Sequence, residues 1–347
     1  MRDDNAFSCM NNPFLIGKDN AIFSPHDELG FIVNNGDFVG NDAFIKRNVA
    51  INMLKSQSNM PIILNMGDSS TSGWHSDSLS RNGNNKSTAP YFHYKTYSDF
   101  MREKYPNTIN AGISKYSSFQ GAKYLALLLR EFSQQDVYPT HVTMYFGNND
   151  SVYSGIEDKT AIDGMQSSKE NTVHRVSISD FKHNISEMIR LSHCYGARPV
   201  IIVPLRRYDW APGLRSIKYS GEYEKGLQEI KSEKLRDELK KARDLYLEGK
   251  LEEAYEMDIF LPRIKERYVF TLRKIAKQQK ADIIDLQKVS RSFQGPDFFC
   301  DYCHPIELAN KLIFEEFLRM MNKKITRRKW NIFSSKNYSP DDIYPIW

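Results

Sequence analysis

Short apolar runs that stop at small polar residues recur along the chain. The first clear run covers residues 61–66, Pro-Ile-Ile-Leu-Asn-Met, and it ends at Gly67-Asp68-Ser69-Ser70. A run of this length, opened by proline and closed by glycine, is typical of a buried strand that delivers a serine to its carboxyl end. Ser69 is then either the N-cap of the next helix, which is the commoner role for such a serine, or a reactive group. The rest of the chain decides between these two roles.

Four later runs also predict strands, and the amphipathic patterns between them predict helices. The strands are expected at 108–111, 141–146, 199–204 and 281–286, and the helices at 94–104, 117–134, 179–196 and 306–321. Strands that alternate with helices build βαβ units, which place helices on both faces of a parallel sheet. We therefore predict an α/β fold, a flavodoxin-like three-layer α/β/α sandwich with a parallel five-stranded sheet.

Residues 1–60 precede this pattern and are expected to form an N-terminal cap. The sequence Asn34-Asn35-Gly36 lies between the apolar segments 31–33 and 38–39. Asn-Gly favours the positive φ angles of a tight turn, so we expect the two segments to pair as a hairpin. Helical spacing over residues 42–56 then predicts a helix before the first core strand.

The α/β domain itself is predicted to span residues 61–322, with one large interruption. Residues 206–280 show long, highly charged helical patterns that are broken near Gly249 and Pro262. Such patterns are typical of a solvent-exposed face. We therefore expect a helical insertion that lies over the sheet, where it could serve as a lid or as a partner surface. Residues 323–347, rich in Lys and Arg, are expected to form a basic C-terminal tail.

Composition excludes several classes of protein. The chain has 347 residues, of which 26% are charged and 40% hydrophobic, as in folded globular proteins. A formal net charge of +5 is too small for this length to indicate nucleic-acid binding. Because no apolar stretch has the length of a membrane span and the first residues lack the core of a secretory signal, we expect a cytoplasmic protein with no transmembrane segment. Four cysteines in so long a chain are no disulfide framework, and we expect reduced thiols.

Residues suited to acyl transfer stand at the predicted strand ends. Ester hydrolysis by a serine needs a base for its proton, a carboxylate that orients the base, and hydrogen-bond donors for the oxyanion. Ser69, Gly112 and Asn149 each follow a predicted strand, whereas Asp301 and His304 lie in the loop before the last helix. The three-residue step between the last two lets one loop hold the carboxylate beside Nδ1, which leaves Nε2 to face the serine.

Four short blocks that contain these residues resemble the SGNH (GDSL-like) hydrolase family. In chain order they are Gly67-Asp68-Ser69, Gly112, Gly147-Asn148-Asn149-Asp150 and Asp301-Tyr302-Cys303-His304. The resemblance covers residues 61–321. One departure is Ser70, where many members have leucine, but this position carries no chemistry.

The resemblance implies a role for each matched position. Ser69 would be the nucleophile, His304 the general base and acid, and Asp301 the group that orients it. The backbone N–H groups of Ser69 and Gly112 and the side-chain amide of Asn149 would form the oxyanion hole. No cofactor and no metal is expected.

The same region also fits other motifs. Cys300-Asp-Tyr-Cys303-His304 matches the attachment string of c-type haem, which requires an exported chain. The two cysteines also fit a redox pair or half of a metal site, although no second cysteine pair completes a zinc set. His26-Asp27-Glu28 together with Cys-x-x-Cys is similar to the zinc deaminase signature, whose parts belong to one compact unit rather than to opposite ends of a chain. None of these motifs explains the other three blocks.

The expected reaction is hydrolysis of a small acyl ester through an acyl-serine intermediate. The family resemblance implies a small-molecule or glycan ester, such as acetyl on a carbohydrate, and Trp74 and Trp210 are either an aromatic floor for a sugar or core residues. An O-acyltransferase would use the same residues, with an alcohol in place of water. A catalytically inactive binding module on the same scaffold is disfavoured, since every catalytic position holds a competent residue.

Overall fold

A seven-stranded sheet forms the centre of the computed structural model. The structure describes residues 23–33, 36–39, 44–56, 59–73, 95–152, 174–213, 227, 233–258, 260–289 and 296–322. In spatial order the strands are β4 (Phe44–Ile45), β3 (Phe38–Val39), β6 (Thr108–Gly112), β5 (Ile63–Gly67), β7 (His141–Tyr145), β8 (Arg198–Ile202) and β9 (Asp282–Ile284). The five strands from β6 to β9 are parallel, which confirms the predicted core. β3 and β4 extend one edge in antiparallel orientation.

The register of the parallel strands brings their carboxyl ends to one edge of the sheet. Gly67, the last residue of β5, pairs with Gly112 of β6 and with Tyr145 of β7. β5 is buried along its whole length, as expected for a central strand covered on both faces, and this explains its nearly continuous apolar sequence. The loops that leave these strands therefore start side by side, at the edge where α/β folds bind their ligands.

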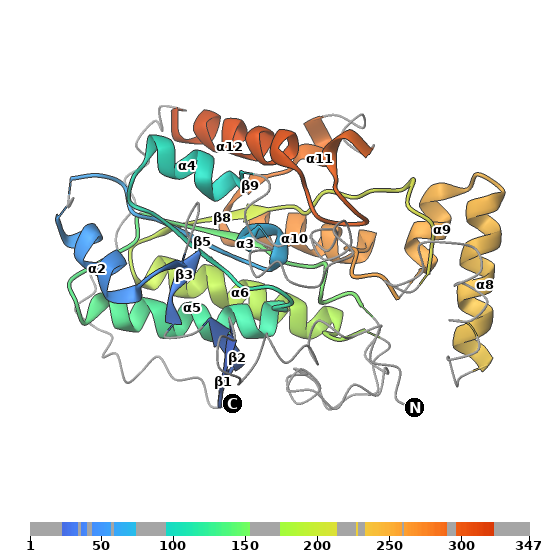
Figure 1. The fold of residues 1–347 in the computed structure, drawn as a ribbon, viewed down its shortest axis with the longest axis horizontal. Coiled ribbons are helices and arrows are strands. Elements are labelled where there is room, and N and C mark those ends of the chain that lie inside the picture. The colour runs from blue at the N-terminus through green and yellow to red at the C-terminus, as the bar shows by residue number, and fades with distance from the viewer. Residues whose placement is uncertain are drawn as a thin grey trace, which may run out of the picture.

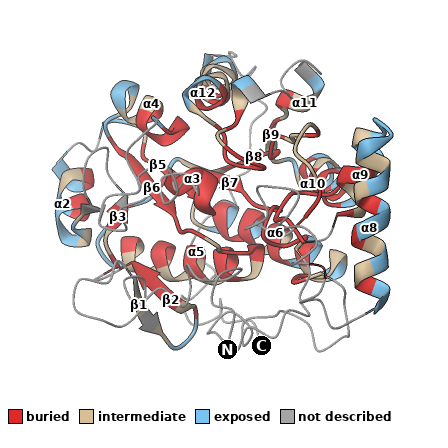
Figure 2. Cartoon of the chain, turned by 45° about the vertical axis from the view of Figure 1, so that its right-hand side comes forward, coloured by how far each residue is buried: buried red, intermediate tan, exposed pale blue. Residues whose placement is uncertain are grey.

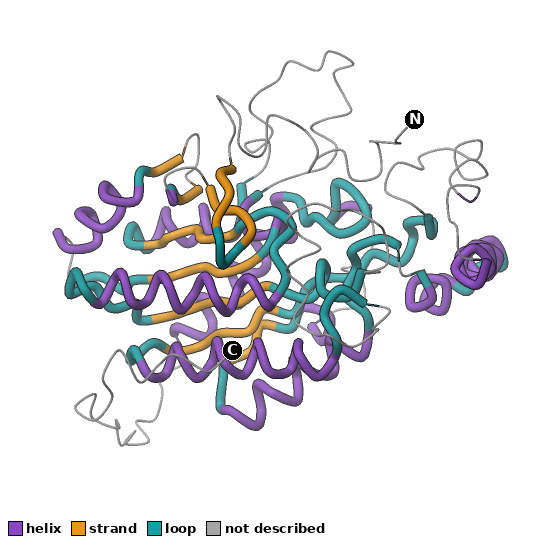
Figure 3. The backbone as a smooth tube through the Cα atoms, turned by 90° about the horizontal axis from the view of Figure 1, so that it is seen from below, coloured by secondary structure: helices purple, strands orange, loops and turns teal. Residues whose placement is uncertain are grey.

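Helices cover both faces of the sheet (Figures 1 and 3). The helices are α4 (Tyr97–Lys104) and α12 (Glu307–Asn322) on one face, and α5 (Ser118–Ser133), α6 (Ile178–Cys194) and α10 (Glu266–Gln279) on the other. Alternate residues of β5 face opposite layers, since Ile63 packs with the first pair of helices and Leu64 with the other three. Buried residues are concentrated in the strands and on the inner sides of these helices (Figure 2). The three-layer prediction is confirmed.

The N-terminal strands pair differently from the prediction. This segment contains β1 (Phe23–His26), β2 (Gly30–Val33) and α2 (Arg47–Ser56) in addition to β3 and β4. β1 pairs with β2, while β3 pairs with β4 and β6, so the predicted hairpin between 31–33 and 38–39 is wrong. The ring nitrogen Nδ1 of His26 accepts the amides of Glu28 and Leu29, which closes a turn one strand earlier than the Asn-Gly sequence.

The charged region after β8 contains two different structures. Among the residues described before α10, this region contains α8 (Glu233–Leu247) and α9 (Leu251–Met257). Short helices described elsewhere include α3 (Ser69–Ser72), α11 (Leu286–Val289) and η4 (Pro296–Phe298). α8 and α9 form a hairpin that turns at Gly249, with a φ of 80°, and it stands beside the sheet instead of over it (Figures 1 and 3). α10 places Leu272 and Ile275 in the core, as the crossover helix between β8 and β9. The expected insertion 206–280 therefore includes a core helix, α10, at its C-terminal end.

Among the residues that the structure describes, no helix has both the length and the apolar character needed to cross a bilayer.

Candidate active site

Ser69 is placed by the tight junction between β5 and α3. Asp68 caps α3 by accepting the Ser70 amide at 2.8 Å through Oδ1. A Cβ on Gly67 would lie 1.9 Å from Thr71 Oγ1, so only glycine lets the helix fold back against the end of the strand. Ser69 is therefore the first residue of a helix that starts directly at the carboxyl end of β5.

Asp301 and His304 are held by one compact loop between η4 and α12. The His304 carbonyl accepts the Cys300 amide at 3.1 Å and closes the loop. Asp301 Oδ1 accepts the backbone amides of Cys303 and His304, each at 2.9 Å. The other carboxylate oxygen, Oδ2, accepts the hydrogen bond from His304 Nδ1 at 2.7 Å. The backbone of this loop thus orients both the carboxylate and the imidazole.

The imidazole connects this loop to the serine. Nε2 of His304 lies 2.7 Å from Oγ of Ser69, a residue 235 positions earlier in the chain. All three groups are buried, and Ser69 is 8% exposed. A hydrogen bond from Nδ1–H to Asp301 leaves Nε2 to accept the serine proton, which is the tautomer that a general base requires. The structure therefore brings together the three residues that the sequence singled out.

Asn149 lies next to the same turn. It follows β7 and is buried, and its side-chain nitrogen Nδ2 donates to Asp68 Oδ2 at 3.4 Å and to the Tyr116 carbonyl at 3.1 Å. The first of these bonds is long for an N–H···O contact and therefore weak. Because Asp68 directly precedes Ser69, this bond places the Asn149 amide close to the turn that carries the serine. Its role as an oxyanion donor stays a prediction.

The structure shows the Gly112 amide in a hydrogen bond within its own strand, and its role as an oxyanion donor stays a prediction. Its amide already donates to Oδ1 of Asn110, two positions earlier in the same strand, at 3.0 Å. The glycine also has a packing function, since a Cβ there would lie 2.5 Å from the Ser72 amide nitrogen and 2.7 Å from Thr71 Cβ. Gly112 is thus required for the approach of α3 to β6, and its own amide is engaged within the strand.

Two buried carboxyl groups change the electrostatics around the serine. Burial raises the pKa of Asp68 to about 7, although the Ser70 amide donates to its carboxylate. Burial also raises the pKa of Asp150 to about 6, although this carboxylate accepts the Ser118 amide at 2.9 Å and the Ser118 hydroxyl at 2.6 Å. The site therefore changes its charge between weakly acidic and neutral pH.

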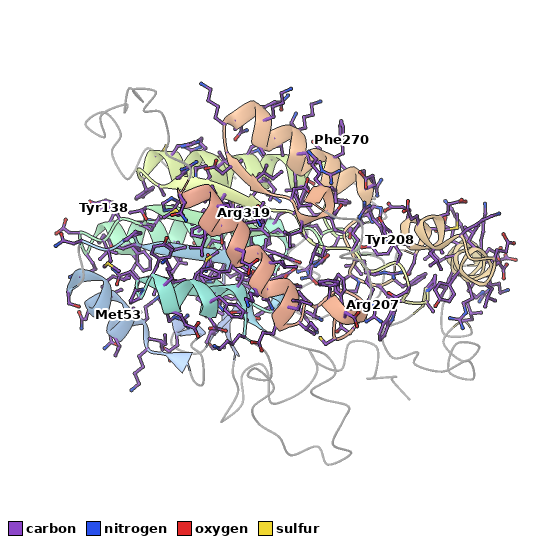
Figure 4. The ribbon with its side chains drawn as sticks, turned by 90° about the horizontal axis from the view of Figure 1, so that it is seen from above. Met53, Tyr138, Arg207, Tyr208, Phe270 and Arg319 are labelled. Carbon is purple, nitrogen blue, oxygen red and sulfur yellow. The ribbon has the colours of Figure 1, made fainter. Side chains whose placement is uncertain are left out.

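Sequence reasoning missed Arg207, which contacts the loop that carries Asp301 and His304. Arg207 donates through Nη1 to the Asp301 carbonyl at 3.0 Å and pairs with Asp209. The Arg207 guanidinium lies 4.9 Å from the Trp210 ring, and that ring meets Tyr302 edge to face at 6.2 Å. Figure 4 shows Arg207 between the α/β/α body and the α8–α9 hairpin. An arginine in a charged segment has no sequence signal that would reveal this contact.

A second missed contact holds the loop after β7, which carries the side-chain amide donor. The Ile264 amide donates to Asn148 Oδ1 at 3.0 Å, and the Ser151 hydroxyl donates to the Arg263 carbonyl at 2.7 Å. A Cβ on Gly147 would lie 2.4 Å from Ile264 Cδ1, so the glycine lets the two loops touch. The two contacts join residues that are 116 and 112 positions apart in the chain, so no local motif predicts them.

A model of the GDSL-like lipase/acylhydrolase family matches residues 63–317. The chain belongs to this family. The match confirms the resemblance that the four sequence blocks indicated, and it makes the protein a hydrolase of the esterase class. The family assignment alone fixes neither the acyl group nor the alcohol of the substrate.

Several solved structures are similar to the chain. The lipase/acylhydrolase from Enterococcus faecalis is 16% identical, with a TM-score of 0.40, and the match covers 76% of this chain and 95% of that chain. The acetylxylan esterase Axe2 from Geobacillus stearothermophilus is 14% identical, with a TM-score of 0.37 and coverage of 76% and 94%. A putative acylhydrolase from Bacteroides fragilis is 16% identical, with a TM-score of 0.40 and coverage of 78% and 94%. No curated protein sequence matches the chain.

Proposed function

We propose that the chain is a serine esterase in which Ser69 is the nucleophile, His304 the general base and acid, and Asp301 the carboxylate that orients the base. The unbroken hydrogen-bonded series from Asp301 through His304 to Ser69 supports this proposal, with 2.7 Å for each contact. A serine within hydrogen-bond reach of a base, itself oriented by a third group, is the arrangement that activates a hydroxyl.

The reaction would proceed in two half-reactions. His304 Nε2 takes the hydroxyl proton as Ser69 Oγ attacks the ester carbonyl, and the resulting imidazolium is stabilised by Asp301. The same proton then passes to the leaving alkoxide as the C–O bond breaks, which yields the acyl-serine and a free alcohol. In the second half, His304 takes a proton from water, the resulting hydroxide attacks the acyl group, and Ser69 regains its proton as the acid leaves.

The negative oxygen formed in each half-reaction needs hydrogen-bond donors. We assign this role to the Ser69 amide, to Asn149 Nδ2 and to the Gly112 amide, which would leave Asn110 Oδ1 for the charged oxygen. Ser69 lies in the first turn of α3, where a helix leaves its amides without acceptors inside the helix. Asn149 would exchange its weak bond with Asp68, 3.4 Å long, for a stronger one to the charged oxygen.

A small acyl group on a carbohydrate is the substrate class that we propose. The family resemblance implies a small acyl group such as acetyl, and the substrate assay below tests this. Trp210 is partly exposed and contacts Tyr302, which lies in the same loop as Asp301 and His304. The Trp210 ring is therefore suited to stack on a sugar ring beside the scissile bond. Trp74, the other aromatic residue considered from the sequence, lies outside the described residues.

Turnover of an activated acetyl ester tests the assignment of the nucleophile. Ser69→Ala is expected to lower kcat by a factor on the order of 10⁴–10⁶, as in other enzymes with a serine nucleophile. Ser70→Ala is the matched control, because it removes a neighbouring buried hydroxyl and should change kcat only a few-fold. A serine-directed phosphonate should label Ser69, as located by mass spectrometry. Unchanged turnover in Ser69→Ala, or label on another serine, refutes the proposal.

The O-acyltransferase alternative uses the same hydrogen-bonded series and differs only in the second acceptor. Candidate sugars added to the same assay distinguish the two reactions. Free acetate as the product supports the esterase, whereas acetylated sugar with little free acetate supports the transferase.

A further inference from the structure

Asp301, Cys303 and His304 each present an atom that can bind a metal, and their buried ligand atoms all lie within 4.8 Å of one another. We propose that these three side chains form an inhibitory site for a thiophilic divalent cation such as Zn²⁺ or Cd²⁺. The inhibitory effect rests on the proposed function, whereas binding of the cation does not.

The distances suit tetrahedral coordination after a small movement. Zinc binds imidazole nitrogen and carboxylate oxygen at about 2.0–2.2 Å and thiolate sulfur at about 2.3 Å, so donors around a tetrahedral ion lie about 3.3–3.7 Å apart. Cys303 Sγ is already 3.7 Å from His304 Nδ1. The Nδ1 to Asp301 Oδ2 distance, now 2.7 Å, must open by roughly half an ångström to accept the ion. Water would supply a fourth ligand.

The chemistry of the donors selects for soft cations. Cys303 is buried and packs with Leu261 and Tyr302 on one side, and a buried thiolate needs a cation to balance its charge. Binding would release the thiol proton to solvent and form a metal–sulfur bond. A thiolate with one imidazole and one carboxylate suits Zn²⁺ or Cd²⁺, whereas Mg²⁺ and Ca²⁺ require a set of oxygen ligands.

Occupation of this site would reverse the tautomer on which the base depends. Neutral imidazole carries one proton, and the Asp301 carboxylate 2.7 Å from Nδ1 favours the tautomer that holds it there. Once Nδ1 gives its lone pair to a metal, that proton must reside on Nε2, where it faces Ser69 Oγ 2.7 Å away. The ring nitrogen beside the serine then donates a hydrogen bond and is unable to take the hydroxyl proton. Acylation therefore stops while the fold is unchanged.

A matched pair of cysteine variants tests the effect on activity. Cys303→Ser removes the soft donor but keeps the backbone amide that Asp301 accepts, so basal turnover should be retained. Cys300→Ser changes a thiol in the same loop whose Sγ contacts the His304 carbonyl at 3.5 Å and which is not a member of the donor set. With an activated acetyl ester, Zn²⁺ in a metal buffer should inhibit the natural protein and Cys300→Ser equally. Cys303→Ser should need at least tenfold more Zn²⁺, and Mg²⁺ should have no effect on any of them.

Binding of Co²⁺ gives a readout that does not depend on turnover. Cobalt in place of zinc should produce a thiolate-to-metal charge-transfer band in the near ultraviolet, and Cys303→Ser should lack it. Ser69→Ala keeps all three donors and should show the band, so the site is tested even if another residue is the nucleophile. Equal inhibition of Cys303→Ser and the natural protein, or absence of the cobalt band in the natural protein, overturns the proposal. A band without inhibition overturns the inhibitory role.

Discussion

Arg263 and Asp258 form an ion pair that is wholly inside the protein. Both side chains are 0% exposed, and Nη2 lies 2.6 Å from Oδ2. Arg263 also donates through Nη1 to the Trp210 carbonyl at 3.0 Å, and its own carbonyl accepts the Ser151 hydroxyl, so it links the segment after β8 to the loop after β7. Asp258→Ala would leave a buried guanidinium without a counter-charge. Loss of one partner of such a pair costs about 3–5 kcal/mol of stability.

Urea unfolding measures this cost directly. Asp258→Ala should lower the free energy of unfolding by about 3–5 kcal/mol. Glu248→Gln is the control, because it breaks an ion pair with Lys250 that is mostly in water and should leave the free energy unchanged within error. The double variant Asp258→Leu with Arg263→Met removes both charges and should recover most of the loss. The reasoning is refuted if Asp258→Ala costs less than about 1 kcal/mol, or if the double variant is no more stable than the single one.

Three further predictions concern catalysis, pH and a helix end. Asn149→Ala should lower kcat by about 10²–10³ with little change in KM, since it removes a donor to the oxyanion, and a loss below tenfold contradicts this role. Burial raises the pKa of Asp68 to about 7 in the folded protein, so the folded state binds the extra proton and stability falls as pH rises from about 4 to about 7. Asp68→Asn should remove this part of the dependence of the free energy of unfolding on pH. In urea unfolding, the variant should therefore be more stable relative to the natural protein at pH 8 than at pH 5, and an equal difference at both values contradicts the prediction. Lys280 ends α10 with a left-handed φ of 56°, so Lys280→Gly should raise the melting temperature, whereas Lys277→Gly inside the same helix should lower it. A lower melting temperature for Lys280→Gly than for Lys277→Gly would contradict the argument that the left-handed backbone at Lys280 is strained.

Much of the site could be predicted because strand ends and loop spacing are visible in the sequence. Carboxyl ends of parallel strands meet at one edge, so recognition of the sheet already places Ser69 near Asn149. The step from Asp301 to His304 is short enough for one loop to orient both side chains. These predictions depend only on local sequence and on the order of the strands.

Local sequence and strand order do not predict where a backbone N–H points or which distant loops touch. A glycine at a strand end can expose its amide, allow a helix to pack closely, or both. Gly112 allows α3 to pack closely, and no local pattern indicates that Asn110 accepts its amide. α10 was assigned to the insertion because a helix with a charged outer face has the composition of an exposed helix. Its buried positions Tyr268, Leu272 and Ile275, at helical spacing, were the available sign of a core helix.

The loop closed by Cys300 and His304 makes the acid–base pair an almost self-contained unit. Its carboxylate and imidazole are aligned by hydrogen bonds among residues 301–304. Two contacts from distant parts of the chain are added to this unit: the Arg207 hydrogen bond to the Asp301 carbonyl and the approach of Ser69 to His304. Disturbances elsewhere in the molecule should therefore reach the acid–base pair through contacts such as these, while the hydrogen bonds within the loop keep the carboxylate beside the imidazole.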